Sequence, residues 1–131
     1  MFEVTIDGRR KLLHIVMQGF WNDDTMARYS EIVVQKSSEL RRAEGCKRIL
    51  INMSDFPIQS KKIAEGHAAF LRTVRDRGEA RVALVMQSAL SKLQAARVAS
   101  DTGHSTFADE AEALAWLMED ELPVIINRPS A

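Results

Sequence analysis

Two short, nearly continuous apolar runs constrain the fold of this chain more than any other feature. They are ILINM at residues 49–53 and VALVM at residues 82–86. Such runs are typical of parallel strands that are buried on both faces, because a strand with one solvent-facing side alternates apolar and polar residues. Between the two runs, apolar residues recur at helical spacing from Ile63 to Val74, and Gly78 follows. The pattern therefore predicts two parallel strands joined by a right-handed crossover helix.

Two further strands are expected before this unit, as an antiparallel hairpin. Residues 2–6 alternate between apolar and polar side chains, Asp7-Gly8 is a turn signal, and residues 12–17 are apolar apart from His14. A short strand is expected at residues 105–107. Capping residues and apolar residues spaced three or four apart predict four helices, at about 23–42, 61–77, 88–100 and 110–118.

These elements predict a single α/β domain. The expected architecture is one layer of mixed, mostly parallel β-sheet with about five strands, an N-terminal antiparallel hairpin and about four α-helices. A chain of 131 residues can bury a core of this kind without disulfides or metals. Residues 1–121 are assigned to the domain. Residues 122–131 are expected to be a C-terminal tail or an added edge strand, and the apolar Val124-Ile125-Ile126 fits either.

Charge and composition exclude several classes of function. Eighteen basic residues balance eighteen acidic ones, so the chain lacks the basic excess of a nucleic-acid-binding protein. No apolar stretch approaches the roughly 18 residues that span a bilayer. The N-terminus lacks the basic start and apolar core of a secretory signal, and the single cysteine, Cys46, fits a reducing compartment. We expect a cytoplasmic protein with no nucleic-acid partner.

No signature of catalysis, metal binding or cofactor binding is found in the sequence. No glycine-rich phosphate loop follows a predicted strand, and no serine has the flanking glycines of a hydrolase nucleophile. The three histidines lack metal-ligand spacing. His14 and His67 are interpreted as hydrogen-bonded histidines at the edge of the core, and His104 as exposed. We therefore predict no catalytic residue, no metal and no cofactor.

The turn after the first buried strand is the most informative candidate site. Ser60 is expected to be the N-cap of the following helix, and Lys61 and Lys62 occupy its first turn, where acidic residues are preferred. Two cations beside exposed N–H groups favour a bound phosphate or carboxylate, or a phosphorylated serine. The alternative interpretation is an ordinary surface helix with two incidental lysines.

Four segments of the chain resemble the STAS-like, anti-sigma-factor-antagonist-like (SpoIIAA-like) superfamily. The resemblance is closest to its branch of small stand-alone bacterial proteins of unassigned function. It extends to about Met118 and rests on the order and spacing of LLHIVMQGFWNDD, ILINMSDF, RVALVMQSALSKLQAAR and STFADEAEALAWL.

The resemblance implies a non-enzymatic regulatory module that binds a partner protein. In antagonist members, a serine at the start of the second helix is phosphorylated, within Asp-Ser-Ser or Asp-Ser-Thr followed by Gly-Leu-Gly. The corresponding segment here is residues 59–63, QSKKI, which keeps the serine but not the acid or the glycines. The predicted contact or regulatory surface comprises Asp55, Phe56, Gln59, Ser60, Lys61 and Lys62.

Two other functions are retained as alternatives to a protein-interaction module. The first is a carrier or sensor of a small anionic or lipid-like ligand, seated at the Ser60 helix start or between helix and sheet. Lipid-handling proteins share the broader fold, although a fold does not decide a function. The second alternative is an enzyme of unknown reaction, for which no nucleophile and base can be named. We also expect that the chain can form a homodimer through the hairpin edge or the tail.

Overall fold

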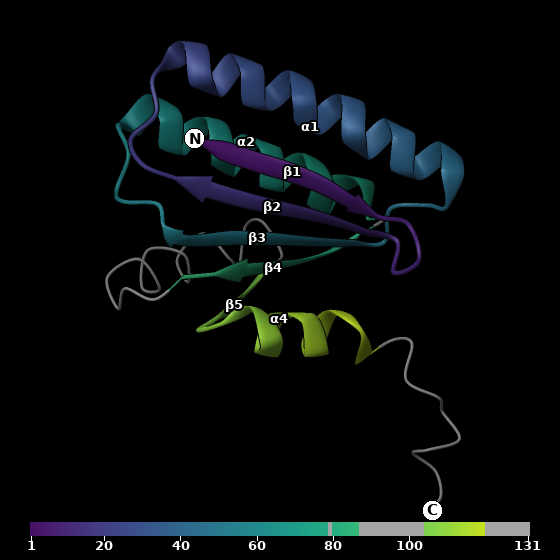
Figure 1. Ribbon diagram of the computed structural model, residues 1–131. Coiled ribbons are helices and arrows are strands. Elements are labelled where there is room, and N and C mark those ends of the chain that lie inside the picture. Colours follow the sequence, from purple (N-terminus) through teal and green to yellow (C-terminus); the bar gives the residue numbers. More distant parts are fainter. Residues whose placement is uncertain (79, 87–103, 120–131) are drawn as a thin grey trace, which may run out of the picture.

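The chain folds around a five-stranded sheet, as shown by a computed structural model that describes residues 1–78, 80–86 and 104–119 (Figure 1). The strands lie side by side in chain order, β1-β2-β3-β4-β5. The hairpin strands β1 and β2 are antiparallel, and every later pairing is parallel. The predicted mixed sheet with an N-terminal hairpin is therefore confirmed. The strands are β1 (Phe2–Asp7), β2 (Leu12–Gln18), β3 (Arg48–Asp55), β4 (Arg81–Val85) and β5 (Ser105–Phe107).

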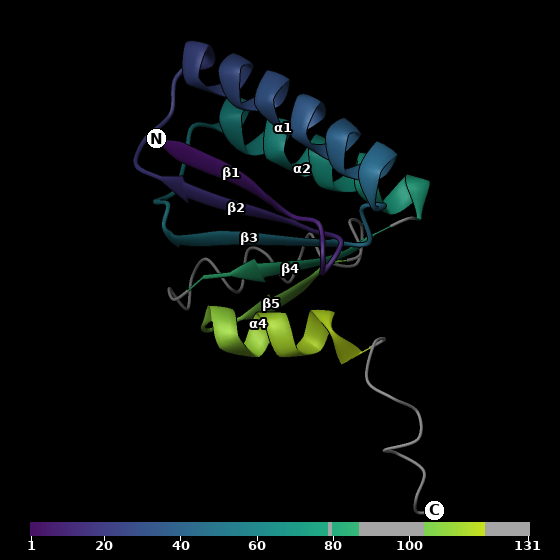
Figure 2. The same cartoon turned by 45° about the vertical axis from the view of Figure 1, so that its right-hand side comes forward.

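Helices cover both faces of this sheet (Figures 1 and 2). One face carries α1 (Asp23–Ala43) and α2 (Lys61–Arg77), and the other carries α4 (Glu110–Leu117). The helix expected at 88–100 lies outside the described residues, as does the segment 122–131 that was expected to be a tail or an edge strand. The described part of the chain thus contains three of the four expected helices.

Capping residues set the ends of these helices where the sequence predicts them. Asn22 accepts a hydrogen bond from the Thr25 amide at the start of α1. Asp109 accepts one from the Glu112 amide at the start of α4, as expected of a capping box. Gly78 ends α2 with a φ of 65°, a left-handed conformation that glycine adopts without steric penalty.

The central strand β3 divides its side chains between two cores. Ile49 and Ile51 pack with the residues beneath α1 and α2, whereas Leu50 packs with those beneath α4. Because successive side chains of a strand point to opposite faces, a strand covered on both sides is apolar at most positions. This requirement accounts for the continuous apolar run that dominates the sequence. None of the described helices has the length and apolar composition needed to cross a membrane.

Candidate functional site

Two loops meet at the edge of the sheet where β2 and β3 end, and the side chain of Gln59 joins them. Its Nε2 donates to the carbonyls of Gly19 at 2.9 Å and Pro57 at 2.7 Å. Its Oε1 accepts from the backbone N–H of Trp21 at 2.9 Å. The Gly19 amide also donates to the Asp55 carbonyl at 3.1 Å. Gln59 therefore uses both ends of its amide to hold the two loops together.

The remaining predicted residues take different positions around this junction. Ser60 caps α2, because its hydroxyl accepts a hydrogen bond from the Ile63 amide at 3.3 Å, as expected. Lys62 pairs with Asp23 at the start of α1 at 3.0 Å, but both side chains are mostly exposed and the pair contributes little to stability. Lys61 projects from the same turn and is exposed. Asp55 is exposed as well.

Large apolar side chains are exposed at this same edge. Phe20 is 79% exposed on the loop after β2, and Ile58 is 57% exposed on the loop after β3. Met1, also exposed, lies beside them because its backbone exchanges two hydrogen bonds with Gln18. We call this region the carboxyl-edge surface, comprising Met1, Phe20, Asp55, Ile58, Gln59, Ser60, Lys61 and Lys62.

Phe20 was not identified from the sequence alone, and Ile58 was not singled out within the predicted turn at residues 55–62. Each lies in a short loop, and apolar residues on a protein surface are common and carry little information by themselves. Their significance depends on the contact between the two loops. That contact joins residues 38 and 40 positions apart in the chain, so no local pattern shows it.

A buried aromatic cluster supports the carboxyl-edge surface from below. The Trp21 ring is central, with ring centroids 4.9 Å from Tyr29, 5.1 Å from His67, 5.2 Å from Phe56 and 5.6 Å from Phe2. Phe56, a predicted surface residue, is half-buried and belongs to this cluster. It holds the turn against the core.

Two polar atoms in this cluster have no hydrogen-bond partner among the described residues. They are the Tyr29 hydroxyl and His67 Nε2. Burial raises the pKa of Tyr29 well above its ordinary value and lowers the pKa of His67 to about 4. The expectation of a hydrogen-bonded His67 is therefore wrong for Nε2. The apolar stripe of α2 places this nitrogen among aromatic rings, where none of the described residues offers it a hydrogen bond.

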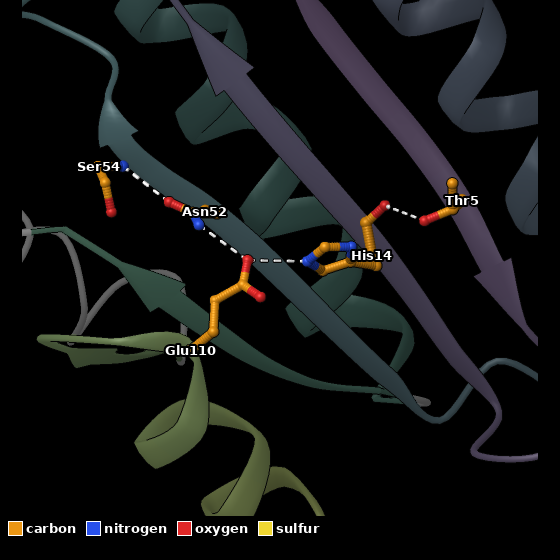
Figure 3. Close-up of polar contacts among 5 residues, drawn as sticks. All are labelled: Thr5, His14, Asn52, Ser54 and Glu110. Carbon is orange, nitrogen blue, oxygen red and sulfur yellow. Dashed lines mark hydrogen bonds and ion pairs between the residues drawn. The ribbon is translucent and has the colours of Figure 1, made fainter.

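A second polar cluster lies on the opposite face of the sheet, between the strands and α4 (Figure 3). Glu110 Oε2 lies 2.9 Å from His14 Nε2 and accepts a hydrogen bond from Asn52 Nδ2 at 2.8 Å. Asn52 is itself oriented by the Ser54 amide, which donates to its Oδ1 at 2.9 Å. The expectation that His14 is a hydrogen-bonded histidine at the edge of the core is confirmed.

The carboxylate of Glu110 is held in its ionised form by this cluster. Its partial burial would raise the pKa, but the hydrogen bonds from His14 and Asn52, and the positive charge that His14 can carry, outweigh burial and lower the pKa. A shallow groove opens beside it, between the hairpin and α4, with Leu12, Leu50 and Leu114 among its lining residues.

The described residues contain no group of three or more His, Cys, Asp or Glu side chains placed to hold a metal ion. His104 is 6% exposed, so the expectation that it lies on the surface is wrong. It directly precedes β5, and the pairing of β5 with β4 brings this part of the chain against the sheet.

Comparison with known proteins identifies the fold of this chain. No protein-family model matches the sequence, and no curated protein is significantly similar to it. Among solved structures, the chain is similar to an uncharacterized protein of the DUF3478 family with a SpoIIAA-like fold from Shewanella loihica PV-4. The two are 18% identical, with a TM-score of 0.69 over 88% of this chain and 93% of the other. The chain therefore has a SpoIIAA-like fold, as its sequence indicates.

Proposed function

We propose that this protein is a non-enzymatic interaction module that binds a partner protein through its carboxyl-edge surface. The proposal rests on one observation. Phe20 and Ile58 are exposed on two loops that the Gln59 side chain joins. The SpoIIAA-like fold agrees with this type of function but does not by itself assign it.

The joined loops favour binding for an energetic reason. Burying an apolar side chain at an interface is worth about 25 cal/mol for each Å² removed from water, but ordering a mobile loop opposes that gain. Here the loops are already ordered by hydrogen bonds to Gln59 and by the packing of Phe56 beneath them. More of the favourable free energy of burying Phe20 and Ile58 therefore remains available for binding.

Charged side chains surround these two apolar residues. Lys61 is exposed in the first turn of α2, where no acidic residue offsets it. Lys62 and Asp23 form an exposed ion pair nearby. Apolar centres with polar rims are typical of protein interfaces. Charges in the rim mainly affect which partner binds and how fast it associates. We infer a partner whose contact patch combines apolar side chains with an acidic group opposite Lys61.

Photo-crosslinking in the native cells tests this proposal. A benzophenone amino acid at position 20 or 58 is expected to capture the same partner. The same substitution at position 34 is the control, because Val34 is 64% exposed on α1 and lies outside the carboxyl-edge surface. With that partner purified, Phe20→Ser and Ile58→Ser should each weaken binding at least tenfold, and Val34→Ser should not. Equal binding by all three variants would contradict the proposal.

Ser60 offers a separate test of regulation at this surface. Its hydroxyl caps α2, and the first turn contains two lysines and no acid, so a phosphate there would meet favourable charges. Incubation with native cell extract and ATP, followed by phosphopeptide mapping, is expected to show phosphorylated Ser60. An unmodified Ser60 in a protein that still binds its partner would exclude this regulation and leave the interaction proposal intact.

The alternative of a small anionic or lipid-like ligand shares part of this surface. Two lysines at the start of α2 favour an anion there, but the Ser60 hydroxyl already accepts from the Ile63 amide. Native mass spectrometry of the purified protein separates the two functions. A bound molecule that is lost in a Lys61→Ala, Lys62→Ala variant would favour the ligand, and the same spectrum reports whether the chain forms the expected homodimer.

A further inference from the structure

The groove between the β1–β2 hairpin and α4 combines an ionised carboxylate with an apolar floor. Leu12 and Leu50 of the sheet form the floor, and Leu114 of α4 and Thr5 of β1 line it as well. Glu110 and His14 stand at its polar end. This groove lies on the sheet face opposite α1 and α2 and uses no residue of the carboxyl-edge surface.

The Glu110 carboxylate retains a free oxygen on the groove. Its Oε2 accepts from His14 and Asn52, whereas Oε1 has no hydrogen-bond partner among the described residues, and the side chain is 42% exposed. The cluster holds the carboxylate in one orientation, because Asn52 is fixed in turn by the Ser54 amide. Figure 3 shows Glu110 reaching from α4 toward β2 and β3.

N-terminal capping of α4 does not account for this arrangement. Asp109 caps the helix through the Glu112 amide, and Glu112 is a further acid in the first turn, so Glu110 is not needed for capping. Asn52 lies within the central strand, a position where asparagine is disfavoured. A polar residue there, aimed at a carboxylate on the edge of a groove, instead fits a binding site.

We propose that this groove binds a small amphipathic amine, whose ammonium group pairs with Glu110 and whose apolar body lies on Leu12, Leu50 and Leu114. The charges of the groove favour a cation. Arg10 and Asp7 at its far end pair with each other at 3.2 Å, so that pair has no net charge. Among the described residues no lysine or arginine pairs with Glu110, so its carboxylate can pair with a ligand cation.

Tight binding requires both the ammonium group and the apolar body of the ligand. An ammonium alone would compete with water for a partly exposed carboxylate, a type of pair worth about 1 kcal/mol or less. An apolar body adds the burial of its surface against three leucines. Hexylammonium has both an ammonium group and an apolar body, so it is a suitable probe. 1-Hexanol is its uncharged counterpart.

Titration of the ¹⁵N-labelled protein with hexylammonium, followed by NMR, tests the proposal. Saturable shifts are expected for amides of α4 and of the β1–β2 hairpin. Glu110→Gln, which keeps the size and hydrogen-bonding shape of the side chain, should weaken binding at least tenfold. Glu112→Gln is the matched control on the same helix and should bind as the unsubstituted protein does. 1-Hexanol should bind at least ten times more weakly than hexylammonium.

A second variant tests the groove without changing its charge. Ala111 is exposed on α4 and lines the groove, so Ala111→Leu should obstruct the site and weaken binding at least tenfold with the fold intact. Absence of saturation, or equal binding by the Glu110→Gln variant, would overturn the proposal. A lysine-containing peptide that binds ten times more tightly than hexylammonium would overturn the assignment to a small molecule and assign the site to a protein side chain.

Discussion

The two faces of the sheet are held by different kinds of contact. Among the described residues, sixteen buried side chains form the core beneath α1 and α2, and six form the core beneath α4. The larger core contains two buried polar atoms, on Tyr29 and His67, that have no partner in the described part of the chain. On the smaller face, hydrogen bonds join the sheet to α4. Arg48 donates to the Leu117 carbonyl, and Asn52 donates to the Glu110 carboxylate.

This difference predicts how the stability of each face responds when a polar group is removed. A buried polar atom without a partner destabilises a fold by about 1–3 kcal/mol, which a large apolar core can offset. Among the described residues the core beneath α4 has less apolar area to offset such a cost, so the hydrogen bonds to α4 matter more there. Removing a polar group that makes these hydrogen bonds should therefore destabilise the α4 face strongly. Removing a buried polar atom that has no partner on the α1 and α2 face should have little effect or even increase stability.

Arg48→Met should give the largest loss of stability. Arg48 is 1% exposed, and its guanidinium donates to the carbonyls of Leu117, at the end of α4, and of Arg10, in the hairpin turn. Methionine keeps much of the volume but removes both charged donors. We expect the free energy of unfolding to fall by about 3 kcal/mol, from two hydrogen bonds to a charged group.

Urea unfolding and hydrogen exchange measure this effect. Exchange should accelerate more for amides of α4 than for amides of α1 in the Arg48→Met variant. Lys47→Met is the matched control, because Lys47 is the exposed neighbour and its loss should change stability by less than about 0.5 kcal/mol. A loss below about 1 kcal/mol for Arg48→Met would mean that apolar packing alone holds α4.

Acid should destabilise the aromatic cluster on the larger face through His67. Burial lowers the pKa of His67 from 6.5 to about 4, so the unfolded chain binds a proton in a pH range where the folded chain does not. Stability is unaffected above pH 6.5 and falls as the pH drops from 6.5 toward 4, by about 3 kcal/mol at most.

His67→Phe isolates this contribution from that of the carboxylates. The variant lacks the titrating ring, so the difference in unfolding free energy between it and the unsubstituted protein should change across this range and level off below about pH 4. Glu110 acts at a lower pH, because its lowered pKa means that its stabilisation is lost only as the pH falls through that value. A constant difference between the two proteins would show that His67 has the same pKa in the folded and unfolded states.

The features that the sequence predicted are those with local causes. The Asp109 cap depends on Glu112 three residues away, and the end of α2 depends on Gly78 alone. The buried strands follow from side chains that alternate between two covered faces. The strands and helix caps therefore followed from short segments, whereas the helix expected at 88–100 and the segment 122–131 lie outside the described residues.

The features that were missed depend on contacts between distant parts of the chain. His14 and Glu110 are 96 positions apart, and Arg48 and Leu117 are 69 apart. Burial of Arg48 also runs against the general preference of arginine for the surface, and no local pattern in the sequence indicated it. The candidate turn was found because Ser60 and its lysines are consecutive, whereas Phe20 joins the same surface only through the folded structure.

The smallest expected effect, and the sharpest test of the contrast between the faces, is a gain in stability from Tyr29→Phe. The Tyr29 ring is 1% exposed and packs against Trp21, and its hydroxyl has no partner among the described residues. Phenylalanine keeps the ring contacts and removes the buried hydroxyl. We expect the free energy of unfolding to rise by up to about 1 kcal/mol, opposite in sign to Arg48→Met.

Absorbance at 295 nm provides an independent check, because Tyr29 is the single tyrosine of the chain. Burial raises the pKa of its phenol, so the folded protein should show no phenolate signal until alkali unfolds it. A loss of stability above about 0.5 kcal/mol in Tyr29→Phe would mean that the hydroxyl is hydrogen-bonded in solution, as by a buried water. The larger face would then depend on polar contacts as the smaller one does, and the contrast between them would fail.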